Sequence, residues 1–343
     1  MKNKWAYGLV AVCGLVLAGC TTGGSNNSSS GSAASSESNA EQVFNVVVQQ
    51  EMPSADLSLA TDTISFSALN NVYEGLYRLD ADSKPQPAGA AEEAEVSEDG
   101  LTYKIKLRDD AKWSNGEPVT AADYVYGWQR TVKPETASEY AYLYAPVKNA
   151  EAITAGEKDP SELGIKAVGD HELEITLEKA TPYFDYLLAF PSFFPQSQAV
   201  VEEHGDQYAA TSDNAVYNGP FVLTGFDGPG TDTEWAYEKN DQYWDKDTVK
   251  LETINVSVVK ESATALNLFQ DGQADDVILT GELAQQMAND EAFVSQPEAT
   301  TYYFEVNQRD EKSPFRNENL RKAISYAIDR DALVTSILLN LIS

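Results

Sequence analysis

The chain has 343 residues, with 54 Asp and Glu against 24 Lys and Arg, a formal net charge of −30 and two cysteines. This length predicts about two domains. The negative charge disfavours nucleic acid as a partner, because its phosphates would be repelled. Two cysteines can form neither a disulfide framework nor a structural zinc site.

The first twenty residues have the pattern of a secretion signal. Lys2 and Lys4 precede an apolar run over residues 5–17, which is short for a bilayer span and ends in small residues. Leu17-Ala18-Gly19-Cys20 resembles a bacterial lipobox. The resemblance implies that the signal peptide, residues 1–19, is removed and that Cys20 carries a lipid anchor.

Residues 20–43 are mostly Ser, Gly, Asn and Ala, which predicts a flexible linker with a reach of roughly 25 Å. A lipid-anchored domain on a long Ser-rich tether is typical of the outer face of a Gram-positive cell membrane. The expected location is therefore extracytoplasmic, with attachment to the membrane through Cys20.

The first elements of the folded chain follow this linker. Residues 44–48 are apolar and β-branched, which predicts a buried strand. Residues 52–65 are rich in Ser, Asp, Thr and Ala and are expected to form a loop. Residues 68–76 have apolar side chains at helical spacing, with Gly75 near the end, and predict a helix.

A turn at residues 97–100 precedes residues 101–107, which alternate between apolar and polar and predict a half-buried strand. Asn115-Gly116 indicates a tight turn, and Thr120 is a good start for a helix. Further predictions are strands at 172–177, 253–258, 277–279 and 301–306, a helix that Ser262 caps and Gly272 ends, and a helix over 317–328. Strands mixed with helices at this length indicate an α/β protein of more than one lobe.

Several of these segments together resemble one known family, the extracytoplasmic solute-binding proteins of peptide and nickel ABC importers, and within it the oligopeptide-binding lipoproteins. The order and spacing fit over about residues 44–338. The resemblance is carried by Asp99-Gly100-Leu101-Thr102-Tyr103-Lys104-Ile105-Lys106-Leu107-Arg108, Ala111-Lys112-Trp113-Ser114-Asn115-Gly116-Glu117-Pro118-Val119-Thr120-Ala121-Ala122-Asp123, Trp128-Gln129-Arg130-Thr131-Val132, Asn218-Gly219-Pro220-Phe221, Tyr243-Trp244, Pro314-Phe315-Arg316-Asn317, Leu320-Arg321-Lys322-Ala323 and Asp329-Arg330.

The resemblance implies a bilobed α/β fold of the periplasmic-binding-protein type II class. A peptide would bind in the cleft between the lobes as an extended strand, through main-chain hydrogen bonds that suit many sequences. The closed form would dock on a membrane permease, and separate ATPase subunits would drive transport. The chain would then be a monomeric binding protein rather than an enzyme, with no cofactor and no metal.

The resemblance also implies a division of the chain. Residues 44–76 and 215–306 would form a discontinuous first lobe, and 77–214 a smaller domain inserted into it. Residues 307–343 would begin a second lobe that is largely missing, because members of this branch are usually longer. We expect a truncated or frame-shifted product, or alternatively a natural short form.

Two sets of binding positions follow from the resemblance. Counting back from Tyr73-Glu74-Gly75-Leu76, the loop that pairs with the peptide backbone corresponds to Thr61, Asp62, Thr63, Ile64 and Ser65, which could also be an ordinary surface loop. Tyr140 matches a tyrosine that faces the cleft, or else packs among its neighbouring tyrosines.

Other functions remain as alternatives. The same fold could serve as a receptor for a signalling peptide, haem or a metal chelate, or the chain could be a truncated product that binds nothing. A surface adhesion protein fits less well, because the importer signature is intact. A hydrolase with paired carboxylates also fits less well, since adjacent pairs such as Asp109-Asp110 would point to opposite sides of a strand.

Overall fold

We describe a computed structural model in which residues 42–295 and 303–333 are placed. The predicted signal peptide, the lipid-bearing Cys20 and nearly all of the linker lie outside these residues. Residue 44, where the folded part was expected to begin, falls within the first strand.

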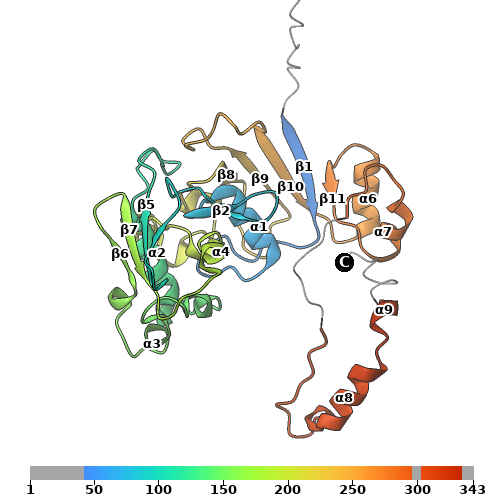
Figure 1. Ribbon diagram of the computed structural model, residues 1–343. Helices are drawn as coiled ribbons and strands as arrows, with labels where there is room; N and C mark the ends of the chain where they lie inside the picture. Colours follow the sequence, from blue (N-terminus) through green and yellow to red (C-terminus); the bar gives the residue numbers. More distant parts are fainter. Residues whose placement is uncertain (1–41, 296–302, 334–343) are drawn as a thin grey trace, which may run out of the picture. The chain divides into compact units, whose positions relative to one another are not determined.

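The largest sheet of the described residues has five strands (Figure 1). Its order is β11-β1-β10-β9-β8. Strand β1 runs parallel to both of its neighbours, whereas β9 is antiparallel to β10 and to β8. The strands are β1 (Val43–Val48), β8 (Phe221–Thr224), β9 (Glu234–Lys239), β10 (Thr253–Val258) and β11 (Asp276–Val277).

The predicted strands of this sheet agree only partly with the structure. The strands expected at 44–48 and 253–258 are confirmed. The strand expected at 277–279 is a two-residue pairing with β1, because Ile278 already leaves the sheet and is 56% exposed. The strand expected at 301–306 is wrong for its described part, since residues 303–306 are irregular and Tyr303 and Phe304 are largely exposed; residues 301 and 302 lie outside the described chain.

Helix α1 (Thr63–Val72) contacts β8 and contributes Leu69 and Val72 to the main core. It starts five residues before the predicted start at residue 68 and ends four residues before the predicted end at residue 76. Asp62 caps its first turn, and Tyr73 is extended, so the chain leaves the helix well before Gly75. The loop expected over 52–65 therefore ends at Asp62.

Helix α6 (Ser262–Gln270) lies beside β1, where Ala265 and Val47 share a small apolar cluster. The predicted Ser262 cap is wrong: Glu261 holds the cap position, and the Ser262 hydroxyl accepts a hydrogen bond from Gln49 Nε2 at 3.2 Å. The helix ends where predicted, because Gly272 follows it at φ +68°. Helix α7 (Gly281–Met287) comes after β11.

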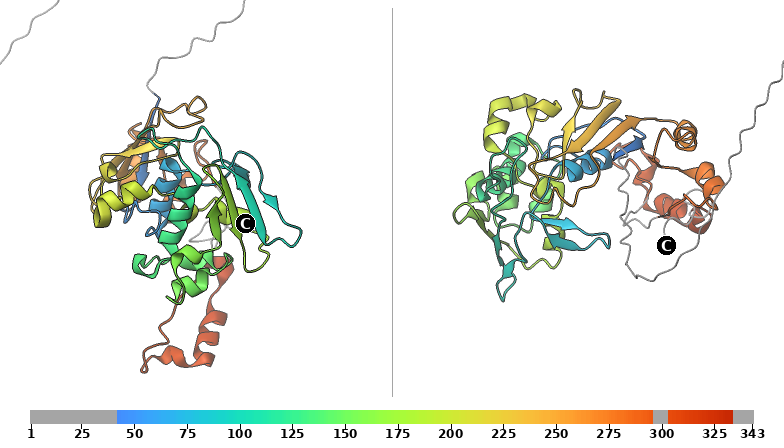
Figure 2. Two further views of the ribbon diagram at one scale, coloured as in Figure 1. Left: turned by 90° about the vertical axis from the view of Figure 1, so that its left-hand side faces the viewer. Right: turned by 90° about the horizontal axis from the view of Figure 1, so that it is seen from above.

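Residues 77–214 connect α1 to β8 and carry two small sheets. Tyr77–Leu79 (β2) and Pro85–Pro87 (β3) form a hairpin. A four-stranded antiparallel sheet has the order β4-β5-β7-β6. Strands β5, β7 and β6 lie side by side in Figure 1, and Figure 2 gives two further views of the chain. The strands of this sheet are β4 (Glu95–Val96), β5 (Thr102–Lys106), β6 (Ile165–Ala167) and β7 (Glu172–Thr176). The predicted strands at 101–107 and 172–177 are thus confirmed.

Helix α2 (Ala121–Val132) packs against β6 and buries Trp128 completely. Its predicted start at Thr120 is confirmed: the Asp123 carboxylate accepts hydrogen bonds from the Thr120 amide at 2.7 Å and from its hydroxyl at 3.0 Å. The predicted turn at Asn115-Gly116 also forms, with Gly116 at φ +89°. The buried apolar side chains of this segment and of the five-stranded sheet join into one cluster.

Short helices complete the described chain. They are α3 (Ala150–Thr154), α4 (Phe184–Leu188), α5 (Gln198–His204) and the 3-10 helices η1 (Pro134–Thr136), η2 (Ala141–Tyr144), η3 (Pro160–Glu162), η4 (Pro191–Phe193), η5 (Gly205–Gln207), η6 (Ser212–Asn214) and η7 (Pro314–Arg316). The helix predicted over 317–328 is confirmed as α8 (Glu318–Ala327), capped by Asn317, and α9 (Arg330–Leu333) follows.

Candidate functional site

The five predicted positions 61–65 lie at the start of helix α1. Asp62 is the N-cap, and Thr63, Ile64 and Ser65 form the first turn. Thr61 and Thr63 are exposed, whereas Ser65 is fully buried and its hydroxyl accepts a hydrogen bond from the Ser54 amide at 3.2 Å. The Ser65 side chain therefore holds the preceding loop and faces the interior, so it is not available to a ligand here.

Asp62 has one carboxylate oxygen engaged and one free. Its Oδ1 accepts a hydrogen bond from the Ser65 amide at 2.9 Å, which satisfies a free amide at the positive end of the helix. Its Oδ2 is buried and has no hydrogen-bond partner among the described residues. This oxygen is the part of the Asp62 carboxylate that the helix cap does not use.

Tyr140, the other predicted position, lies against the start of α1 although it is about 75 residues away in the sequence. Its ring stacks on Phe190 at 5.7 Å between centroids and meets the edge of Phe66 at 5.2 Å. Phe66 follows Ser65 directly in α1 and also contacts Phe190 at 4.8 Å. The two separately predicted sets of residues are thus brought into one place by Phe66 and Phe190.

The phenol of Tyr140 lies in a partly buried and negatively charged setting. Burial raises the pKa of Tyr140, and Tyr142, Asp62 and Glu139 raise it further because each would repel a phenolate. Tyr140 is consequently neutral at physiological pH, with a hydroxyl that can donate or accept a hydrogen bond.

A buried ion pair fixes the loop that leads to this place. Arg130 of α2 donates two hydrogen bonds to the Asp56 carboxylate, at 2.7 and 2.6 Å, and one to Gln196 Oε1 at 2.8 Å. Ser58 Oγ lies 2.8 Å from Thr131 Oγ1 and accepts a hydrogen bond from Gln196 Nε2. The loop before α1 is thereby fastened to α2, six residues ahead of Asp62.

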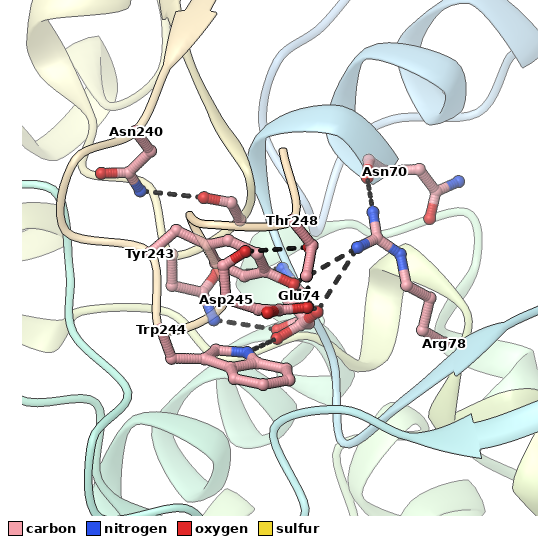
Figure 3. A network of polar contacts seen from close by, with 10 residues as sticks. Asn70, Glu74, Arg78, Asn240, Tyr243, Trp244, Asp245 and Thr248 are labelled. Carbon is pink, nitrogen blue, oxygen red and sulfur yellow. Dashed lines mark hydrogen bonds and ion pairs between the residues drawn. The ribbon is translucent and has the colours of Figure 1, made fainter. Parts of the chain in front are cut away.

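A second buried carboxylate joins segments that are distant in the sequence. Glu74 accepts hydrogen bonds from the Tyr243 hydroxyl and from Trp244 Nε1, each at 2.6 Å, and Arg78 lies 3.5 Å away (Figure 3). Arg108 stacks over the Trp244 ring at 3.4 Å. Burial raises the pKa of Glu74, although the hydrogen bonds and the two arginines favour its charged form.

The backbone around Glu74 explains another pair of residues in the sequence signature, Asn218-Gly219. The Asn218 side chain accepts from the Glu74 amide at 3.1 Å and donates to the Glu74 carbonyl at 2.9 Å. A Cβ on Gly219 would lie 2.6 Å from the carbonyl carbon of Val72, so only glycine fits. Asn218 and Gly219 therefore hold the backbone between α1 and β2 in place.

The structural role of Glu74 was missed from the sequence. The available signal was an acidic residue inside the otherwise apolar run Val72-Tyr73-Glu74-Gly75-Leu76, since a carboxylate in such a run requires partners. Arg130 was noticed only as part of a family match, and its partner Asp56 lies 74 residues away.

Neither metal chemistry nor a membrane span is indicated in the described chain. Residues 42–295 and 303–333 contain no group of three His, Cys, Asp or Glu side chains that could hold a metal ion. Over the same residues, no helix has the length and apolar character required to cross a bilayer.

Comparison with known proteins identifies the family. The family described as bacterial extracellular solute-binding proteins, family 5, middle region, matches residues 84–342. The chain belongs to this family, as the sequence signature predicted.

Two of the similar curated proteins are longer and are named for binding peptides. The chain is 35% identical to the oligopeptide-binding protein OppA of Bacillus subtilis over 98% of its own residues and 61% of that protein. It is equally identical, with the same shares, to a dipeptide-binding protein of Lactococcus lactis. It thus spans about three-fifths of the length of these curated relatives.

Solved structures agree. Listeria monocytogenes OppA bound to peptide is 48% identical, with a TM-score of 0.82, over 87% of this chain and 58% of that one. The pheromone receptor PrgZ is 42% identical, with a TM-score of 0.84, over 87% of this chain and 59% of PrgZ. The predicted α/β fold of the solute-binding class is therefore confirmed over the shared part.

Proposed function

We propose that this chain provides the oligopeptide-capturing part of an ABC importer. The observation that carries the proposal is the meeting of Asp62, at the head of α1, with Tyr140 through the rings of Phe66 and Phe190. Relatives named for binding oligopeptides and dipeptides support it.

The start of α1 suits a bound peptide in two respects. Thr61 and Thr63 are exposed on a backbone that the Asp56–Arg130 ion pair holds in place, so little ordering is needed when a ligand binds. Tyr140 adds an apolar ring face and a neutral hydroxyl next to that backbone. An extended peptide would pair with the backbone near Thr61, with one side chain against Tyr140.

A photoreactive pentapeptide tests this placement, because covalent capture reports the contact even when affinity is low. The full chain is irradiated with an alanine-rich pentapeptide carrying a diazirine, and the adducts are mapped by mass spectrometry. We expect labelling at 61–65 and at Tyr140 that an excess of unlabelled peptide suppresses.

Variants make the crosslinking specific. Tyr140→Ala should reduce labelling at 61–65, whereas Asp159→Asn, which alters a capping aspartate on the distant 3-10 helix η3, should leave it unchanged. Labelling that unlabelled peptide does not suppress, or that concentrates elsewhere, would contradict the proposal.

We further propose that Cys20 carries the lipid that holds the chain on the extracytoplasmic face of a Gram-positive membrane, where it would meet the permease and ATPase subunits of the importer. The lipobox sequence supports this, as do relatives from Bacillus and Lactococcus. Metabolic labelling with a fatty-acid analogue should mark the chain, and Cys20→Ala should abolish the label. Persistent labelling of that variant would refute the assignment.

We also propose that residues 44–76 and 215–306 form one discontinuous lobe and that residues 77–214 form a smaller domain inserted into it. The pairing of β1 with β10 and β11 supports it, because both sides of the insertion contribute to one sheet. Because Leu76 and Tyr77 are buried in the core that both parts share, the division describes the order of the chain through the sheets and not a linker open to proteases.

A receptor for a signalling peptide is the second candidate. The likeness to the pheromone receptor PrgZ favours it. If the chain is a general peptide binder, any unlabelled alanine-rich pentapeptide should suppress the crosslinking. If it is a dedicated receptor, only a particular apolar sequence should suppress it.

A further inference from the structure

An exposed aromatic surface adjoins the proposed binding site. We call Phe66, Tyr140, Tyr142 and Phe190 the Tyr142 patch. Three of these rings are partly buried and pack on one another, but Tyr142 is 66% exposed, with its ring 5.8 Å from that of Tyr140. Core packing does not require so exposed a tyrosine beside a finished stack, whereas a ligand that covers its face would use it.

The charges around this patch are negative. Asp62 and Glu139 both act on the Tyr140 phenol and raise its pKa, after the larger effect of burial. The unpaired Oδ2 of Asp62 adds a carboxylate oxygen without a donor of its own. Lys133, the basic residue of the connection from α2 to Tyr140, acts instead on the carboxylate of Asp159.

We propose that the Tyr142 patch is a subsite for a cationic side chain, lysine or arginine, of a bound peptide. This rests on the proposed function and specifies which peptides the site prefers. The face of a tyrosine ring attracts a cation through its quadrupole, and nearby carboxylates add Coulomb attraction. A neutral aromatic side chain would gain only the ring contact, and an acidic one would be repelled.

The geometry assigns the roles within the patch. Tyr142 supplies the accessible ring face, because it is exposed whereas the other three rings of the patch are partly buried. Glu139 is exposed and can approach the charged end of a long side chain, whereas Asp62 is half-buried and acts through its field. Tyr142 and Glu139 are therefore the residues whose substitution should change preference without removing peptide binding.

A peptide series measures the preference. Calorimetry or competition for the diazirine peptide compares alanine pentapeptides in which one position, taken in turn, is lysine, norleucine or glutamate. Norleucine has nearly the same chain length as lysine but no charge. At one position lysine should bind about tenfold more tightly than norleucine, the sum expected of a cation–π contact and a nearby carboxylate, and glutamate should bind more weakly than norleucine.

Variants test which residues recognise the charge of the peptide side chain. Tyr142→Leu and Glu139→Gln should each lower the lysine-to-norleucine ratio to roughly threefold, because each removes one of the two contributions, and the double variant should bring the ratio close to one. Tyr183→Leu replaces another tyrosine that is more than half exposed but lies outside the patch, and should leave the ratio unchanged.

The outcomes distinguish this inference from the proposed function. The cationic subsite is refuted if lysine and norleucine bind equally at every position, or if Tyr142→Leu leaves their affinity ratio unchanged. Either result is still compatible with the proposed peptide capture. Absence of binding by every peptide overturns both.

Discussion

Replacing Arg130 by methionine should destabilise the protein far more than loss of a surface ion pair. The Arg130 side chain is 16% exposed and that of Asp56 only 7%. Arg130→Met would leave the Asp56 carboxylate buried with one remaining hydrogen bond, from the Ser58 amide at 2.8 Å. An uncompensated buried charge of this kind costs about 3–5 kcal/mol of unfolding free energy.

The assay is urea unfolding of the full chain at pH 7, followed by tryptophan fluorescence. Lys166→Met is the matched control, because Lys166 pairs with Glu174 at 2.7 Å but is 63% exposed, and its loss should cost less than about 1 kcal/mol. Adding Asp56→Asn to Arg130→Met should restore at least about 1 kcal/mol by removing the stranded charge. If Arg130→Met costs no more than the control, the reasoning is wrong.

Three further predictions concern the same framework. Gly219→Ala should cost about 2–4 kcal/mol in urea unfolding, because its Cβ would meet the backbone of Val72 at 2.6 Å and the chain must shift; a neutral result would contradict the close approach. Burial raises the pKa of Glu74 in the folded state above its unfolded value of 4.5, so folding takes up a proton at pH values between the two. The free energy of unfolding should therefore fall as the pH rises through this window. Glu74→Gln should flatten this part of the plot of stability against pH, and an unchanged plot would refute the assignment. Asp123→Ala removes the acceptor of the Thr120 amide and should lower the melting temperature by a few degrees, equivalent to about 1 kcal/mol; Asp82→Ala, at an ion pair with Lys84 in which both side chains are exposed, serves as its control.

Local pattern was sufficient for the two alternating strands at 102–106 and 172–176 but not for helix α1. The strands at 102–106 and 172–176 alternate because one face is buried, and alternation is visible in any sequence. The start of α1 contains Thr63, Ser65 and Ser67, so its apolar pattern is weak there. Its end is set by tertiary contacts, since Asn218 binds the backbone of Glu74 in an extended conformation.

The candidate site was predictable as two separate sets of positions and not as one place. Its assembly depends on Phe66, Tyr140 and Phe190, which come from three distant segments. No periodicity within a single segment reports which rings will stack across 50 or more residues. The resemblance to a known family supplied the positions, and only the fold brought them together.

The position of β1 has a consequence for how the chain is made. This first strand lies between β10 and β11, and its residue Asn45 contacts Asn255, 210 residues later. At about 5–20 residues per second, roughly 10–40 s of synthesis separate the emergence of β1 from that of its partners. During this time its apolar residues remain unpaired. The sheet can close only after β10 and β11 are available, and pairing between strands so distant in the sequence favours slow folding.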